Sequence, residues 1–341
     1  MTTEDFNFTL PEALIAQHRI EPYDHAKLLT LEKHTNKLTD TVFYKIPDFL
    51  TTNDVLVFNN TKVFKARLLG RKSSGKETEL LLLERPLIEK KSYTCLIRGK
   101  AREGDTFLFT NGLIATVTTA NTDGSKTVAF NKEGIELVNT IEAIASLPLP
   151  PYITESAGKD SYQTVYADNA KEGSIAAPTA GFHFTTSLLD TLKNKGVIME
   201  YITLDVGIGT FRPVKTERIE DHDMHKEHYH IDQDVLIRLN EYKKEGRRIV
   251  AVGTTAVRTL EDSANQTNQL QKTDETTAIF IYPPYTFTFV DAMITNFHLP
   301  KSTLLMLVSA FAGKENIMEA YATAIEKKYR FFSFGDAMYI Y

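Results

Sequence analysis

The segment Asn296–Gly313 joins polar side chains that could do chemistry to the start of an apolar helix. His298 can transfer protons near neutral pH, while Asn296 and Lys301 can hold polar or anionic groups. Ser302 can cap the helix, whose first turn has unpaired backbone N–H groups and the positive end of the helix dipole. The segment therefore predicts either an anion or polar-ligand site at a helix start, or a capped core helix that follows a turn.

A second histidine follows a stretch of small residues between Gly173 and Thr185. Small side chains let a ligand approach the backbone closely. His183 comes just before an expected helix start, where its pKa could be tuned for proton transfer. The alternative is a tight loop with a histidine satisfied in the core. The other candidate ligand-facing residues here are Pro178, Thr179, Gly181 and Phe184.

The glycine-rich run Leu204–Thr210 resembles the first motif of Rossmann-type methyltransferases, in which a strand ends in Asp-x-Gly-x-Gly. Pro213 follows too early for the crossover helix that this motif requires. Gly207 and Gly209 are therefore interpreted as shaping a ligand-facing turn. Thr210 and Arg212 are candidates in the same turn, and Arg212 could bind a carboxylate or phosphate.

Two further segments could contribute to a site. Val250–Glu261 reads as a buried strand, a glycine and a threonine-capped helix, and α/β folds place ligands at such strand ends. Thr254 and Thr255 could be simple caps, but Arg258 one turn later is harder to explain structurally. Asp336 places a carboxylate in an aromatic tail, which is otherwise a C-terminal strand that seals the core.

Four histidines lie among acidic residues between Glu217 and His230, and histidine and carboxylate are good metal ligands. Their spacing matches no standard zinc signature, and histidines in an acidic loop are often surface residues. We therefore expect no metal site. The histidines are His222, His225, His228 and His230, and the acidic residues near them include Glu227.

Composition limits the protein class. The 341 residues suffice for two domains, and 42% hydrophobic and 24% charged residues are ordinary for a soluble globular protein. Cys95 is the one cysteine, which excludes an internal disulfide and a four-cysteine zinc site and fits a reducing compartment. The N-terminus lacks the features of a secretory signal, and the apolar run Leu304–Ala312 is too short to span a bilayer. We expect a cytoplasmic protein.

Charge is distributed unevenly along the chain. Thr61–Gly104 contains twelve basic and five acidic residues, a net charge of +7 in a chain whose total is −5. The rest of the chain then carries −12. A basic segment in an acidic protein is typical of polyanion binding, although solubilising lysines on strand surfaces are the alternative.

The expected elements are of two kinds. Val63–Phe130 alternates with period two and contains the hairpin dipeptides Asn111-Gly112 and Asp123-Gly124, which predicts a small antiparallel barrel or sandwich. Helices and strands alternate from Gly173 onward, which predicts α/β layering. We also expect a short helix from Pro11 to about Ile20 and a polar loop over Ser263–Thr277.

Several sequence words occur together in one order along nearly the whole chain. They include Asp5-Phe6, Leu28-Leu29, Val57–Val63 and Tyr162–Ala167, followed by the glycine-rich, Thr254-Thr255, His298 and Phe332–Met338 segments. Together they closely resemble the S-adenosylmethionine:tRNA ribosyltransferase-isomerase family of queuosine biosynthesis.

This resemblance implies a fold and a reaction. It implies a large, barrel-like α/β domain formed by residues 1–61 and 148–341, with a small antiparallel β-barrel domain inserted at 62–147. The reaction would transfer and isomerise the ribosyl moiety of S-adenosylmethionine, as co-substrate, onto 7-aminomethyl-7-deazaguanine at the tRNA wobble position. Epoxyqueuosine-tRNA would form, adenine and methionine would be released, and no metal would be needed. We expect a monomer that acts without a membrane.

The candidate residues take the following roles as a hypothesis. His183 and His298 transfer protons, Lys301 and Ser302 hold an anionic or carbonyl group, and Arg212 or Arg258 binds the methionine carboxylate. Asp336 and Glu227 read donors on the deazaguanine or the sulfonium charge, and Arg19 is a further substrate-binding candidate. The expected tRNA-binding residues are Lys62, Arg67, Lys90, Lys91, Lys100 and Arg102. Two alternatives remain open at this point: an S-adenosylmethionine-dependent RNA methyltransferase and a non-catalytic RNA-binding protein.

Overall fold

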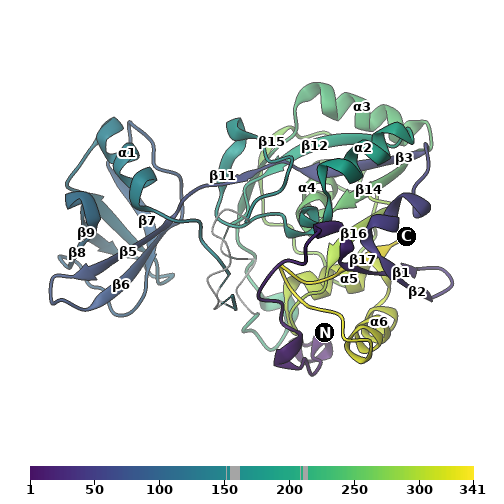
Figure 1. Cartoon of the computed structure of the whole chain (residues 1–341), viewed down its shortest axis with the longest axis horizontal. Coiled ribbons are helices and arrows are strands. Elements are labelled where there is room, and N and C mark those ends of the chain that lie inside the picture. Colours follow the sequence, from purple (N-terminus) through teal and green to yellow (C-terminus); the bar gives the residue numbers. More distant parts are fainter. Residues whose placement is uncertain (151, 154–161, 208, 210–213) are drawn as a thin grey trace.

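The structure of the chain is a computed structural model that describes residues 1–150, 152–153, 162–207, 209 and 214–341. It contains a large lobe built on a mixed sheet and a small lobe built on a closed barrel, joined by a narrow connection (Figure 1). Both chain termini lie in the large lobe, so the small lobe is inserted between segments of the large one.

Nine strands form the sheet of the large lobe in the part of the chain that is described. Its centre is parallel, and antiparallel strands lie toward both edges. Since the strand order ends at β15 and β2, this sheet has two edges rather than closing. The order is β15 (Asp274–Thr277), β13 (Glu227–His230), β12 (Ile198–Leu204), β3 (Asp54–Asn59), β14 (Arg248–Val252), β16 (Ala292–Asn296), β17 (Ala337–Ile340), β1 (Lys27–Glu32) and β2 (Lys37–Val42).

Alternate side chains of the central strands enter separate apolar cores on the two faces of the sheet. In β3, Val55 and Val57 pack in one core, whereas Leu56 and Phe58 pack in another. The first core also receives the apolar faces of four helices, and the second receives that of α2. The helices are α2 (Thr186–Asn194), α3 (Gln233–Lys244), α4 (Thr254–Ala264), α5 (Thr303–Ala312) and α6 (Lys314–Glu326).

The small lobe is a closed barrel whose interior is filled by apolar side chains such as Leu68, Tyr93 and Phe107. The hairpins predicted at Asn111-Gly112 and Asp123-Gly124 join β8 to β9 and β9 to β10. Helix α1 (Gly134–Ile144) packs against the same core. The strands are β5 (Arg67–Lys72), β6 (Glu77–Leu82), β7 (Ser92–Ile97), β8 (Thr106–Leu108), β9 (Ile114–Ala120) and β10 (Lys126–Phe130).

Two chain segments connect the lobes. On the way out, β4 (Lys62–Val63) pairs in parallel with β11 (Glu172–Ser174). On the return, the backbones of Arg67 and Ser146 exchange hydrogen bonds of 3.0 and 2.9 Å. The domain boundaries at 62 and 147 stay a prediction that these crossings support.

The mixed α/β class and the inserted antiparallel barrel are confirmed. The helix expected over Pro11–Ile20 is wrong, because only the short 3-10 helix Glu12–Leu14 forms there. The backbone beyond it pairs with the C-terminal tail instead, and Phe331 N donates to Leu14 O at 2.8 Å. The loop expected over Ser263–Thr277 is partly wrong, since β15 occupies its end.

Candidate functional site

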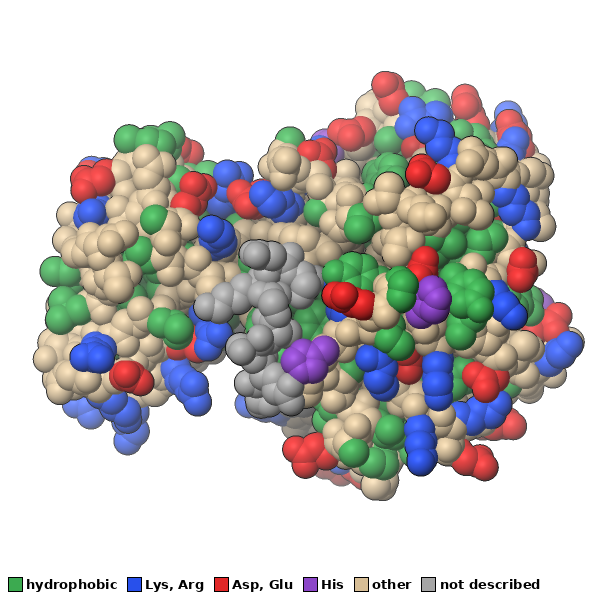
Figure 2. Space-filling view, viewed as in Figure 1, with side chains coloured by type: hydrophobic (Ala, Val, Ile, Leu, Met, Phe, Trp, Pro, Cys, Tyr) green, Lys and Arg blue, Asp and Glu red, His purple; other side chains and the backbone are tan. Residues whose placement is uncertain are grey.

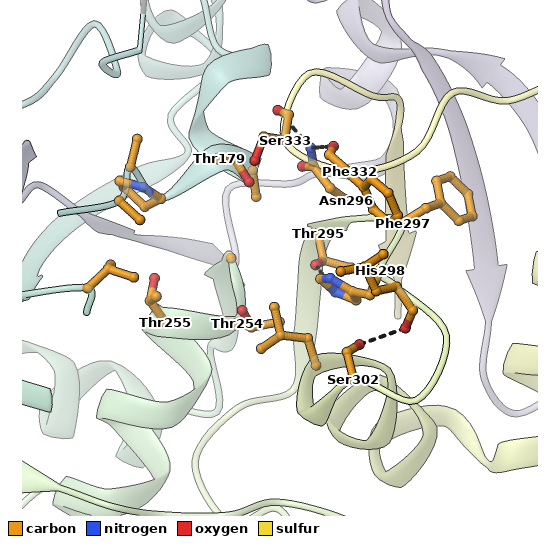
Figure 3. A pocket seen from close by; sticks show the side chains of 18 of the residues that line it. Thr179, Thr254, Thr255, Thr295, Asn296, Phe297, His298, Ser302, Phe332 and Ser333 are labelled. Atoms are coloured by element: carbon orange, nitrogen blue, oxygen red, sulfur yellow. Dashed lines mark hydrogen bonds between the residues drawn. The ribbon is translucent and has the colours of Figure 1, made fainter. Parts of the chain in front are cut away.

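A cavity lies beyond the carboxyl ends of the parallel strands β14 and β16, where α/β sheets place ligands. It holds about 700 Å³ of space free of protein atoms, part of it open to solvent. We call it the main cavity. In the view of Figure 3, the helix starts that carry Thr254 and Ser302 lie below the cavity, and Thr179 and Ser333 lie above it. The other predicted site residues that line it are Pro178, Thr255, Asn296 and His298.

The turn between β14 and α4 brings two hydroxyl groups to the main cavity. Gly253 links strand to helix with a φ of 93°, a conformation that favours glycine. Thr254 and Thr255 follow in the first helical turn, whose backbone N–H groups lack intrahelical partners. Asn59 at the end of β3 donates to Thr255 Oγ1 over 3.3 Å, which fixes the second hydroxyl in place.

The start of α5 forms another wall. Ser302 caps the helix, because its Oγ accepts a hydrogen bond from Leu305 N at 3.2 Å. Ser302 and Leu304 line the cavity, while the helix beyond them is buried in the core. The capped core helix is therefore confirmed for the buried part, and the ligand site at the helix start stays a prediction that the cavity supports. Contrary to expectation, the described residues that line the cavity do not include Lys301, whose Nζ lies 2.5 Å from Glu4 Oε2.

His298 is the histidine that lines the main cavity. Burial lowers the pKa of its imidazole to about 3, because a charged ring would lose its hydration. Its Nε2 lies 3.0 Å from Thr295 Oγ1, and its backbone N–H donates to Tyr321 Oη at 2.9 Å. The ring is therefore held in a defined position and is neutral at physiological pH.

His183 lies on the other side of Asn296, and its Nε2 is 3.3 Å from Asn296 Oδ1. Burial lowers the pKa of His183 to about 4. His183 lines a separate, smaller cavity with Arg19 and Tyr23, and Ser333 lines both cavities. The Arg19 guanidinium stacks 3.5 Å from the centre of the Phe182 ring. The two candidate proton-transfer histidines thus face different cavities that share a wall.

A third cavity, which we call the second pocket, adjoins the main cavity at Leu304. Gly209, Glu227 and Arg258 line it, so three more of the predicted residues lie together. Glu227 and Arg258 form a buried ion pair. Gly207 lies at its edge and donates its backbone N–H to Glu227 Oε1 at 2.9 Å.

Three of the predicted site residues belong to the packed interior and line neither the main cavity nor the second pocket. The Phe184 ring packs in the core, with its centre 5.0 Å from those of Phe43 and Phe58. Asp336 is buried and accepts from the backbone N–H groups of Lys27 and Arg330 at 3.0 and 2.7 Å. Gly181 has no room for a side chain, because a Cβ atom there would lie 1.8 Å from Tyr166 Oη. Thr210 and Arg212 lie outside the described residues.

Comparison with known proteins places the chain in a family. The sequence model described as queuosine biosynthesis protein matches residues 3–340. The chain belongs to the queuosine biosynthesis protein family. It is 48% identical over 345 residues to an S-adenosylmethionine:tRNA ribosyltransferase-isomerase from Desulfitobacterium hafniense, with all of both chains covered. The crystal structure of an S-adenosylmethionine tRNA ribosyltransferase from Thermotoga maritima matches with a TM-score of 0.57 and 36% identity, covering 99% of this chain and 100% of that one.

Four of the six residues expected to bind tRNA lie close to an acidic side chain. Lys62 pairs with Glu172 and Arg67 with Glu79, at 3.1 and 2.8 Å. Lys90 pairs with Glu84, and Lys91 lies 3.9 Å from Glu133. Lys100 and Arg102 are exposed, and no acidic side chain pairs with either among the described residues. Figure 2 shows Lys and Arg side chains gathered on the lower part of the small lobe, including the side toward the large lobe.

Sequence reasoning missed several residues of the main cavity. Tyr152, Thr295, Phe332 and Ser333 line it, and Tyr152 Oη lies 2.6 Å from Ser333 Oγ. Phe332 contributes its carbonyl group, which accepts from Asn296 Nδ2 at 2.8 Å. A backbone carbonyl leaves no trace in residue type, so the aromatic tail suggested only Asp336.

The four histidines of the segment 217–230 lie in two different surroundings. His228 and His230 contact Asp274 at 2.8 and 3.1 Å, whereas His222 and His225 line the second pocket. No group of three or more side chains suited to hold a metal ion occurs within the described parts of the chain. In those same parts, no helix has the length and apolar character needed to cross a membrane.

Proposed function

We propose that this protein is an S-adenosylmethionine:tRNA ribosyltransferase-isomerase of queuosine biosynthesis. The observation that carries this function is the 48% identity to a ribosyltransferase-isomerase over the whole length of both chains. The substrate would be tRNA with 7-aminomethyl-7-deazaguanine at the wobble position. S-adenosylmethionine would donate its ribosyl group, and adenine and methionine would leave. We propose that the protein acts in the cytoplasm as a monomer.

In this proposal the reaction takes place in the main cavity. A base must remove a proton from the ribosyl carbon that bears the sulfonium group. Over the whole reaction the ribosyl group becomes bonded to the modified base as its bonds to sulfur and to adenine break, which releases methionine and adenine. His298 lines the cavity in the unprotonated form that a proton acceptor requires, although burial makes it a weaker base than a free imidazole. The hydroxyl groups of Thr179, Thr254 and Ser302 can hold the ribosyl and base hydroxyl or amino groups.

In this proposal, His183 influences the main cavity through its contact with Asn296. Asn296 lines the main cavity and accepts a hydrogen bond from His183. A change in the protonation of His183 would therefore change the strength of this hydrogen bond to the Asn296 amide. In this proposal, the smaller cavity lined by His183 and Arg19 receives a group of the modified base. Arg19 stacked on Phe182 offers a flat cationic surface that suits such a base.

The inserted barrel at 62–147 is proposed to hold the tRNA. It carries fourteen basic and ten acidic residues, a net charge of +4, while the whole chain carries −5. A positive lobe attached to a negative one favours a polyanion on the small lobe. Lys100 and Arg102 are the strongest candidates for phosphate contacts, because neither charged group forms an ion pair within the described residues. The Asp105 carboxylate accepts from the backbone N–H of Arg102 at 2.8 Å, which leaves the guanidinium itself exposed.

Product analysis tests this function. The protein would be incubated with S-adenosylmethionine and tRNA that carries the modified base, and the small molecules would be separated by chromatography. Ribosyl transfer releases free adenine and methionine. A methyltransferase would release S-adenosylhomocysteine instead, and a non-catalytic RNA-binding protein would leave S-adenosylmethionine intact. Either of these results would contradict the proposal.

A further inference from the structure

The second pocket lies one helical turn away from the main cavity along two helices. In α4, Thr255 lines the main cavity and Arg258 lines the second pocket. In α5, Ser302 lines the main cavity, Leu307 lines the second pocket and Leu304 lines both. The two cavities are therefore adjacent, with Leu304 between them.

The polar wall of the second pocket is a buried ion pair. Arg258 is 5% exposed and Glu227 is 4% exposed. Arg258 Nη1 donates to Glu227 Oε2, and Arg258 Nε donates to Ile279 O at 3.4 Å. Arg258 Nη2 is buried and has no hydrogen-bond partner among the described residues. A buried guanidinium N–H without an acceptor is costly, so this group is suited to a ligand that brings an acceptor.

Glu227, in contrast, has unused positions that can accept hydrogen bonds. From the described residues, its Oε1 accepts one hydrogen bond, from Gly207 N at 2.9 Å, and its Oε2 accepts one from Arg258 Nη1. An ionised carboxylate has about four acceptor positions, so about two remain for a donor. The pocket thus offers one free donor on a cation next to free acceptor positions on an anion.

Charge balance selects the ligand class. The charges of Arg258 and Glu227 cancel, so a bound anion alone would leave an uncompensated buried charge. A zwitterion keeps the balance, because its carboxylate faces Arg258 and its ammonium group faces Glu227. The remaining wall contains apolar side chains such as Met224, Phe280 and Leu307, which fit a short aliphatic chain.

We propose that the second pocket binds the zwitterionic amino-acid end of S-adenosylmethionine, with the carboxylate on Arg258 and the ammonium group on Glu227. The ribosyl and adenine parts then occupy the main cavity. This inference rests on the proposed function and assigns Glu227 to the ammonium group rather than to the sulfonium or the deazaguanine.

The first test compares two co-substrates in the wild-type protein. Decarboxylated S-adenosylmethionine retains the sulfonium, ribosyl, adenine and amino groups and lacks only the carboxylate. We expect kcat/KM for adenine release to fall about 10- to 100-fold with it, mostly through a higher KM, since one charge-assisted contact is lost. Equal kcat/KM for both co-substrates would overturn the carboxylate assignment while leaving ribosyl transfer intact. Absence of adenine from both would instead refute the proposed function.

Variants separate the two contacts. Arg258→Lys keeps the charge beside Glu227 but loses the planar fork, so it should lower kcat/KM for S-adenosylmethionine about tenfold or more beyond any loss that it causes for the decarboxylated compound. Glu227→Gln should lower kcat/KM for both compounds, because both carry the ammonium group. If Arg258→Lys weakened both compounds equally, Arg258 would not bind the carboxylate.

A matched control is available in α3. Arg238 donates to Glu200 from both Nε and Nη2 at 2.7 Å, and neither residue is among the described residues that line the two cavities. Arg238→Lys should leave kcat/KM unchanged for both compounds. Thermal unfolding of each variant checks that it is folded. If Arg258→Lys does not fold, the wild-type comparison of the two co-substrates still decides the inference.

Discussion

Asn296 Oδ1 lies 3.3 Å from His183 Nε2, and this contact determines which ring nitrogen carries the proton. Asn296 Nδ2 donates to Phe332 O at 2.8 Å, so the amide oxygen is the atom that faces the histidine. An amide oxygen can only accept a hydrogen bond. His183 must therefore be protonated on Nε2, which leaves Nδ1 as the nitrogen that can accept a proton.

Replacement of Asn296 tests this arrangement. Asn296→Asp places a carboxylate beside His183 Nε2, and the negative charge should raise the His183 pKa from about 4 by about 1–2 units. The measurement is a pH titration of the ring nitrogens by ¹⁵N NMR. An unchanged pKa, or an Nδ1-protonated ring in the wild type, would show that the two side chains do not interact as described.

Stability should depend on pH through the two buried histidines. Their pKa values are lowered from 6.5 to about 4 for His183 and about 3 for His298. The unfolded chain then binds more protons than the folded one below the unfolded pKa, so the free energy of unfolding falls as the pH drops through this window. Over the full window this amounts to about 3 kcal/mol for His183 and about 5 kcal/mol for His298.

Denaturant unfolding at a series of pH values measures this effect. His183→Gln and His298→Gln should each make the loss of stability between pH 6.5 and about 4 shallower than in the wild type. A variant with the same slope as the wild type would mean that its histidine is not buried in the neutral form.

Gly181 has no room for a side chain. A Cβ atom there would lie 1.8 Å from Tyr166 Oη, and the Tyr166 ring is held against Phe58 at 4.8 Å. Gly181→Ala should lower the free energy of unfolding by about 1–3 kcal/mol through overpacking. Gly207→Ala is the control, because the nearest atom to its Cβ would be 3.8 Å away. Equal melting temperatures for the two variants would contradict the close packing.

The exposed basic residues of the barrel should carry the salt dependence of tRNA binding. The double variant Lys100→Gln/Arg102→Gln should weaken binding and reduce the slope of log K against log salt by about 1–2, as expected for two phosphate contacts. Lys62→Gln is the comparison, since Glu172 already compensates its charge at 3.1 Å. A larger effect of Lys62→Gln than of the double variant would place the tRNA elsewhere.

Local signals predicted much of the fold. Asn111-Gly112 and Asp123-Gly124 specify tight turns by their own backbone preferences, and both form hairpins of the barrel. The Ser302 cap follows from the same kind of local chemistry. The segment Pro11–Ile20 has a helical pattern but pairs with the tail near Phe331, and such tertiary pairing leaves no local signal.

Much of the lining of the main cavity was predictable from the sequence, but the pair in the second pocket was not. Thr254, Asn296, His298 and Ser302 line one cavity, as their positions at strand ends and helix starts suggested. Arg258 and Glu227 are separated by 31 residues in sequence, and only the fold reveals that they form a buried pair. Lys301 was expected beside His298 and Ser302 in the pocket, yet its half-buried side chain reaches Glu4 instead.

A double-label experiment tests the central claim most directly. S-adenosylmethionine labelled in the ribosyl carbons would be compared with S-adenosylmethionine labelled in the methyl group, each with tRNA that carries the modified base. The proposed function predicts that the ribosyl label enters the tRNA in equal amount to the adenine released, and that the methyl label does not enter it. Methyl label in the tRNA without ribosyl label would contradict the account.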